Sequence, residues 1–111
     1  MRIYISLPIT GREKEAREKA DRVKTMLSKM GHGPINPFEI YIGPNATYGQ
    51  CMGADVTALI DHAEAIFLCK GWRESKGCKI EKFVAETCGK KVIYEERDEQ
   101  DAEDESKYYY R

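Results

Sequence analysis

Glu81 is the side chain whose place in the sequence is hardest to explain without chemistry. It follows the apolar run 65–69 and lies near the start of a predicted helix, Gly77–Cys88. At about 100° per residue it is about 40° from Ala85, on the apolar face of that helix. A carboxylate there costs free energy unless it is paired or lines a cavity, so we interpret Glu81 as a functional carboxylate. The alternative is a partly exposed side chain that pairs with a neighbouring Lys.

The elements that would position Glu81 alternate along the chain between short apolar runs and helical periods. Strands are predicted at Arg2–Leu7, His32–Ile35, Ala65–Cys69 and Val92–Tyr94, and helices at Arg12–Met30, Gln50–His62 and Gly77–Cys88. This alternation is typical of an α/β fold with a parallel sheet and helices on both of its faces. We therefore predict a single small doubly wound domain, Rossmann- or flavodoxin-like, with a four- or five-stranded parallel sheet.

In such sheets, ligands bind outside the carboxyl ends of the strands. The loops predicted at that edge, together with the first turn of the last helix, hold Thr10, Gly11, Tyr41, Tyr48, Trp72, Ser75 and Glu81. A helix start also offers free backbone N–H groups and a positive dipole end, which suit an anion. The sequence therefore predicts one site on this rim.

Charge is divided unevenly between the body of the chain and its end. Residues 1–94 hold 15 basic and 11 acidic side chains, whereas residues 95–111 hold 3 basic and 8 acidic ones. We predict a domain at residues 1–95 and an acidic, flexible tail at 96–111, because a charge run without apolar partners stays solvated. A mildly basic body suits a phosphorylated small ligand and is too weak for duplex nucleic acid.

The cysteines and apolar runs indicate the compartment. Cys51, Cys69, Cys78 and Cys88 form no CxxC pair, and we expect the last three to be small core residues. We interpret them as reduced thiols of a cytoplasmic protein. His32 and His62 lie far from any clustered Cys, so no metal is expected. No apolar run is long enough to span a membrane, and no membrane partner is expected.

Three segments resemble one superfamily: residues 3–11 (IYISLPITG), 55–59 (DVTAL) and 71–81 (GWRESKGCKIE). Together they resemble the nucleoside 2-deoxyribosyltransferase-like superfamily, which includes the deoxynucleoside 5′-monophosphate N-glycosidases. They are most similar to a small offshoot catalogued as a domain of unknown function. The resemblance covers about residues 2–94. It implies cleavage or transfer of the N-glycosidic bond of a 2′-deoxynucleoside or its 5′-monophosphate, without a cofactor.

The resemblance also implies roles for individual residues. Glu81 matches the catalytic nucleophile, Asp55 the acid that holds the deoxyribose, and Tyr4 an active-site tyrosine. Ser75 and the Thr10–Gly11 turn match the 5′-phosphate site, and we add Gly77 and Trp72 to the predicted substrate-binding residues. A carboxylate suits this chemistry, because displacement at an anomeric carbon passes through an oxocarbenium-like state.

Each role has a structural alternative. Asp55 could cap the first turn of its helix, Tyr4 could be a core residue, and Trp72 could cover the sheet edge. Ser75 could be an N-cap, a role that is compatible with binding. Where relatives usually have Gly before the first Pro, this chain has Leu7, whose side chain is expected to narrow the site. Either the substrate is smaller or shifted, or binding is kept without catalysis.

Two other functional classes stay open. The same rim without turnover would make a nucleotide-binding or sensor module, and the acidic tail could serve a small interaction protein.

Assembly is predicted separately, from apolar side chains that one small domain does not readily cover: Phe38, Ile40, Tyr41, Ile42, Tyr48 and Met52. Such patches usually mark interfaces, and relatives have sites near subunit contacts. We therefore expect a homodimer or higher homo-oligomer, with this segment closing the pocket.

Overall fold

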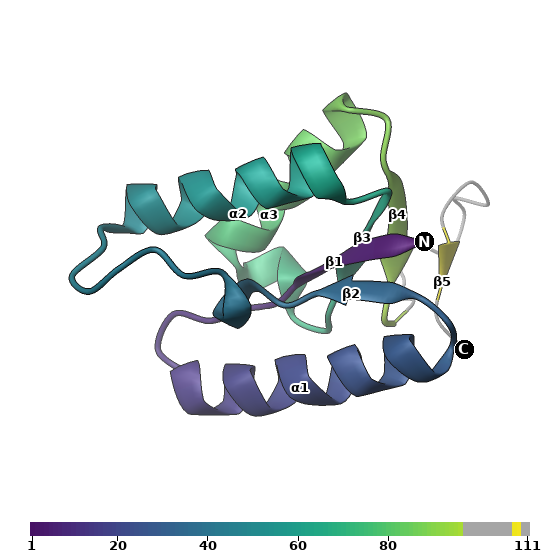
Figure 1. Cartoon of the computed structure of the whole chain (residues 1–111), viewed down its shortest axis with the longest axis horizontal. Helices are drawn as coiled ribbons and strands as arrows, with labels where there is room; N and C mark the ends of the chain where they lie inside the picture. The colour runs from purple at the N-terminus through teal and green to yellow at the C-terminus, as the bar shows by residue number, and fades with distance from the viewer. Residues whose placement is uncertain (97–107, 110–111) are drawn as a thin grey trace.

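The computed structural model describes residues 1–96 and 108–109 of the chain (Figure 1). Its elements are β1 (Arg2–Ser6), α1 (Glu13–Lys29), β2 (Gly33–Ile35), the 3₁₀ turn η1 (Pro37–Glu39), α2 (Tyr48–His62), β3 (Ala65–Leu68), the 3₁₀ turn η2 (Trp72–Glu74), α3 (Lys76–Thr87), β4 (Lys91–Tyr94) and β5 (Tyr108–Tyr109). The predicted alternation of strands and helices is confirmed. None of the helices in the described part is both long and apolar enough to cross a lipid bilayer.

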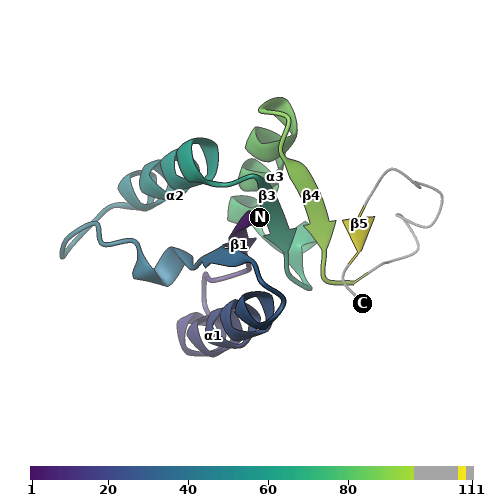
Figure 2. The same ribbon diagram turned by 45° about the vertical axis from the view of Figure 1, so that its right-hand side comes forward.

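All neighbouring strands of the sheet are parallel, in the order β2-β1-β3-β4-β5. Helix α1 covers one face, and α2 and α3 cover the other (Figure 2). The predicted α/β fold is thus confirmed. The chain moves outward from β1 to β2 and then returns to β3 on the other side. The carboxyl ends of β1 and β3 therefore flank the topological switch point, where ligands bind in doubly wound sheets.

Two apolar cores lie on either side of the sheet, and β1 contributes to both. Ile3, Ile5 and Leu7 pack with α1, whereas Tyr4 lies in the core beneath α2 and α3. This division follows from the two-residue period of a strand, which directs successive side chains to opposite faces. Because helices cover both faces, β3 is buried along its whole length. The side chains of β1 and β3 are thereby held on a rigid platform.

The start of α2 differs from the prediction because of its cap. The Thr47 hydroxyl accepts from the Gln50 backbone N–H, and the Gln50 side chain accepts from the Thr47 N–H. This capping box starts α2 at Tyr48, two residues before the predicted start. The Asn36 side chain likewise caps η1 by accepting from Phe38 N–H, in a segment for which the sequence allowed a loop with one helical turn.

Cys88, which was predicted in the core, is exposed, because it is the C-cap of α3, beyond the turns that pack on the sheet. Cys69 and Cys78 are buried, as predicted.

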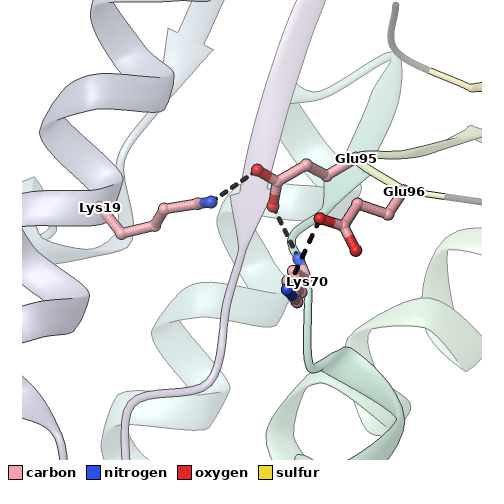
Figure 3. A network of polar contacts seen from close by, with 4 residues as sticks. All are labelled: Lys19, Lys70, Glu95 and Glu96. Carbon is pink, nitrogen blue, oxygen red and sulfur yellow. Dashed lines mark hydrogen bonds and ion pairs between the residues drawn. The ribbon is translucent and has the colours of Figure 1, made fainter.

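Polar contacts of Glu95, next to the carboxyl ends of β3 and β4, connect the end of the domain to α1 and to the segment after β3. Its carboxylate pairs with Lys19 of α1 and accepts from the Lys70 backbone N–H at 2.7 Å, and Glu96 lies 3.8 Å from the Lys70 ammonium (Figure 3). Most of the predicted acidic tail, residues 97–107 and 110–111, lies outside the described residues. Tyr108 and Tyr109 form β5 alongside β4, a pairing that the sequence did not predict.

Candidate active site

Glu81 lies in the interior, between α3 and β1. It is only 5% exposed, and two hydroxyl groups from β1 donate to its carboxylate. Tyr4 OH donates to Oε2 at 2.7 Å, and Ser6 Oγ donates to Oε1 at 2.7 Å. Tyr4 and Ser6 reach the same carboxylate because residues two apart on a strand share a face. The alternative of a surface Glu paired with Lys does not describe this residue.

Burial dominates the electrostatics of Glu81. It raises the pKa of the carboxyl to about 7, with a smaller contribution from the nearby Asp55, while the hydrogen bonds from Tyr4 and Ser6 act in the opposite direction. A carboxyl group with a pKa near 7 is present in both protonation states at neutral pH. That property is common among groups that act as nucleophiles, acids or bases.

Asp55 is the second carboxylate of the site. It lies well inside α2 and not in its first turn, so the helix-capping alternative is excluded. Burial raises its pKa to about 6, and a hydrogen bond with Tyr4 lowers it. Its Oδ1 atom is buried and has no hydrogen-bond partner among the described residues. Buried acceptors are rarely left unpaired in native proteins, so this oxygen is suited to accept from a ligand hydroxyl.

Tyr4 connects the two carboxylates. Burial raises the pKa of its phenol well above the ordinary value, and the charges of Glu81 and Asp55 raise it further. The phenol therefore keeps its proton and acts as a donor. Tyr4 is also a member of the core beneath α2 and α3, which was its predicted structural alternative.

The start of α3 forms the outer part of the site. Ser75 is the N-cap, since its Oγ accepts from Cys78 N–H at 3.2 Å. The first turn of α2 lies against Gly77: a Cβ added there would be 3.3 Å from Met52 Cε and 3.4 Å from Tyr48 OH. Tyr48 therefore borders the predicted phosphate-binding helix start, although the sequence marked it only as a rim residue.

The first loop contributes an exposed turn. Gly11 has a φ of +78°, which favours glycine, and Arg12 N–H donates to Ile9 O at 2.9 Å to close the turn. In the described part of the chain, no hydrogen bond connects Thr10 or Gly11 with Ser75 or Glu81. The first loop does approach the segment between β3 and η2. A Cβ added to Gly71 of that segment would lie 3.4 Å from Pro8 Cγ.

Comparisons with known proteins identify the family and the fold of the domain. The model of a family described as a domain of unknown function (DUF4406) matches residues 1–94. The chain belongs to the DUF4406 family. Among solved structures, the CMP N-glycosidase BcmB of Clostridium botulinum is 20% identical and has a TM-score of 0.64 over 99% of this chain and 87% of that one. No curated protein matches. At 20% identity, this likeness shows that the two proteins share a fold.

Leu7 does not narrow the site of this DUF4406 domain, and that expectation was wrong. Its side chain is buried in the core against α1, together with Ile3 and Ile5. Tyr4 and Ser6 point to the other face, toward Glu81. The period of β1 thus directs the isobutyl group away from the nucleophile candidate, and this reason for doubting catalysis disappears.

Trp72 takes the structural one of its two predicted roles. It is 9% exposed, and its ring centroid lies 5.6 Å from that of Tyr94 on β4. The Arg73 guanidinium lies 4.5 Å and the Lys82 ammonium 5.5 Å from the Trp72 ring centroid. Since the ring packs on the sheet and the Arg73 and Lys82 cations lie against it, it does not present an open face on which a nucleobase could stack.

Ser6 is the site residue that the sequence analysis missed. The only available signal was its spacing from Tyr4, which places both on one strand face.

Elsewhere, residues 1–96 and 108–109 contain no group of three or more His, Cys, Asp or Glu gathered to hold a metal ion. A surface depression of about 460 Å³ runs along α1, on the other side of the sheet from Glu81. It is lined by Asp21, Lys24, Thr25, Ser28 and Lys29 and shares no residue with the site.

Proposed function

We propose that this DUF4406 protein cleaves or transfers the N-glycosidic bond of a 2′-deoxynucleoside or a deoxynucleoside 5′-monophosphate, with Glu81 as the nucleophile. One observation carries the proposal: the Glu81 carboxylate is buried and held through both oxygens by Tyr4 and Ser6 at 2.7 Å. A surface ion pair or a helix cap would not need this arrangement. A nucleophile does, because its reacting oxygen must be fixed relative to the substrate.

In the proposed reaction, the bond between the base nitrogen and C1′ of the sugar breaks. The base leaves with the bonding electron pair and takes up a proton, while positive charge develops on C1′ and the ring oxygen. The Glu81 carboxylate stabilises this charge or bonds to C1′ as a glycosyl ester. Water then adds to C1′, loses a proton and restores the carboxylate. In the transfer reaction, a second base replaces water.

Asp55 and Tyr4 support this chemistry. The unpaired Oδ1 of Asp55 accepts a hydroxyl of the sugar, which removes an otherwise unsatisfied buried acceptor. Tyr4 donates to Glu81 and, as bond formation to C1′ withdraws charge from the carboxylate, its hydrogen bond passes toward Asp55. We assign Glu81, Asp55 and Tyr4 the catalytic roles.

We propose that the 5′-phosphate binds at the start of α3, at Ser75 and Gly77, together with the Thr10–Gly11 turn. The free N–H groups and the dipole of a helix start favour an anion. Tyr48 borders the same place. The solved relative is named for an activity on CMP, which is a ribonucleotide, so both ribose and deoxyribose substrates belong in the test.

The test is release of free base from a panel of nucleosides, deoxynucleosides and their 5′-monophosphates, followed by liquid chromatography. Glu81→Gln keeps the shape of the side chain and should abolish release. Glu86→Gln is the matched control, because Glu86 is exposed on the same helix and pairs with Lys82 at the surface. Turnover of a confirmed substrate by Glu81→Gln at a near-normal rate would exclude this mechanism.

The second candidate is a nucleotide-binding or sensor module on the same rim. One observation favours it: both carboxylate oxygens of Glu81 already accept hydrogen bonds from Tyr4 and Ser6, as a residue with a structural role would. Thermal stabilisation by a nucleotide without release of base would identify this function.

We also infer assembly into a homodimer or a higher homo-oligomer. The surface that supports it is smaller than the sequence indicated, because Phe38 and Ile40 pack against the two cores. Tyr41 is 87% exposed, and Tyr48, at the start of α2 and beside Gly77, is 56% exposed. Contact through these tyrosines would cover apolar surface and deepen the site.

A further inference from the structure

The hydroxyl of Ser6 is buried and donates a hydrogen bond to a buried carboxylate. The residue is 1% exposed, and its Oγ donates to Glu81 Oε1 at 2.7 Å. Its backbone is held in the sheet, where Ser6 pairs with Leu68 and its carbonyl accepts from Cys69 N–H at 2.9 Å. A hydroxyl in this place cannot be explained as core packing, because a methyl group would fill most of the same volume without needing a partner.

We propose that Ser6 is a positioning residue, which fixes the orientation of Glu81 Oε1 and holds the carboxylate in its ionised form. This inference rests on the proposed function, in which Glu81 is the nucleophile. Tyr4 holds one carboxylate oxygen and Ser6 the other, both from the same central strand. Groups placed by rigid strands keep their geometry better than groups placed by loops. With both oxygens held, the side chain of Glu81 has one orientation toward the substrate.

The two donors to Glu81 are not equivalent. Tyr4 is shared, since its phenol also lies within hydrogen-bonding reach of Asp55 on α2 and lowers the pKa of that carboxyl. Ser6 donates to Glu81 Oε1, and this hydrogen bond opposes the effect of burial on the Glu81 pKa.

The groups that face Glu81 come from three elements: Tyr4 and Ser6 on β1, Asp55 on α2 and Cys78 on α3 itself. Burial raises the pKa of the Cys78 thiol, so Cys78 brings no negative charge to the cluster near neutral pH. Ser6 and Ser75 both lie within hydrogen-bonding reach of that thiol. The Cys78 S–H can therefore donate to the Ser6 oxygen while Ser6 donates to Glu81, which orients the hydroxyl toward the carboxylate.

The direct test is the ionisation of Glu81 itself. Protein labelled with ¹³C in the glutamate carboxyl groups is titrated by NMR, and the Glu81 signal is assigned from its loss in Glu81→Gln. Ser6→Ala should raise the apparent pKa of Glu81 by about one unit, because a donor to the charged form is lost. Ser6→Thr keeps the hydroxyl and should restore the original value. Ser28→Ala, which removes an exposed hydroxyl on α1, is the control. An unchanged Glu81 titration in Ser6→Ala overturns the proposal.

Activity provides the second measurement. In Ser6→Ala, the acid limb of the kcat profile should move to higher pH together with the Glu81 titration, while KM changes little. A loss of kcat that is equal at all pH values would show a merely structural role and overturn the proposal. If the wild-type protein releases no base from any substrate, the proposed function fails, and the titration still decides the role of Ser6.

If Ser6→Ala folds poorly, the pH dependence of its unfolding free energy tests the proposal instead. Loss of a donor to an ionised group destabilises the fold mainly at high pH, where Glu81 carries its charge. Ser6→Ala should therefore recover on acidification toward pH 5, and also when it is combined with Glu81→Gln. A defect that is the same at pH 5 and pH 8, or in the double variant, would contradict the proposed interaction.

Discussion

Tyr4 and Glu81 are 77 positions apart in the sequence, and their side chains share a 2.7 Å hydrogen bond in the interior of the protein. Tyr4 lies on the first strand and Glu81 on the last helix of the described domain. Closing this distance requires the sheet and α3 to be in place. The candidate active site is therefore complete only in the folded protein, and changes at its residues should affect both catalysis and stability.

Replacing Glu81 by Gln should stabilise the protein at pH 8. The folded-state pKa of about 7 lies above the ordinary value of 4.5, so the folded state keeps a proton that the unfolded state has released between these values. The Glu81 contribution to stability consequently falls as the pH rises from about 4.5 to 7, and the loss is complete above pH 7. Removing the charge should raise the free energy of unfolding by about 1–3 kcal/mol at pH 8 and by much less at pH 5.

Urea unfolding of Glu81→Gln and the wild type at the two pH values measures this difference, with Glu86→Gln as the surface control. A variant that is less stable than the wild type at pH 8 would show that the hydrogen bonds from Tyr4 and Ser6 outweigh the burial of the charge.

Tyr4→Phe should reduce turnover strongly while the ring still fills the core. Glu81 Oε2 loses its donor, and the pKa of Glu81 rises further. Loss of a hydrogen bond to a charged group corresponds to about 10–100-fold in kcat at neutral pH, and to about 1–2 kcal/mol in stability. Tyr41→Phe removes an exposed hydroxyl and should change neither quantity. Undiminished base release by Tyr4→Phe would remove Tyr4 from the mechanism.

A deoxynucleoside 5′-monophosphate should bind more tightly than the corresponding nucleoside, and salt should reduce the difference. Gly77→Ala should diminish this preference, since its Cβ would meet Met52 and the Tyr48 hydroxyl at the start of α3. Gly53→Ala is the matched control on α2, where an added Cβ meets nothing within 4 Å. Calorimetric titrations at low and high salt compare the binding of the nucleotide and of the nucleoside to the wild type and the two variants. Equal affinity for nucleotide and nucleoside at low salt would rule out the phosphate site.

The protein should assemble in solution, with Tyr41 at the contact. Light scattering at micromolar concentration should give a mass of at least twice 12.7 kDa. Tyr41→Ser should weaken the assembly, whereas Met30→Ser changes an exposed apolar side chain at the far end of α1 and should not. A clean monomer mass for the wild type would refute the interface and favour the binding module over the enzyme.

Local patterns in the sequence determined the elements, the parallel sheet and the position of Glu81 on a buried helix face. The periods of 2.0 and 3.6 residues are written into consecutive side chains, and the right-handed crossover of parallel strands leaves few topologies to choose from. The same patterns brought Ser75 to the start of α3 and the predicted loops to one rim. They located the site but not its hydrogen bonds.

Only the tertiary structure decided which groups surround Glu81. The register of α3 against β1 brings Ser6 and Tyr4 to its two oxygens, and the packing of α2 buries Asp55 Oδ1, which has no hydrogen-bond partner among the described residues. Leu7 and Trp72 turn into the two cores for the same reason. These outcomes depend on packing between segments far apart in the chain, where the burial of whole faces determines where each side chain lies. No short stretch of sequence contains that information.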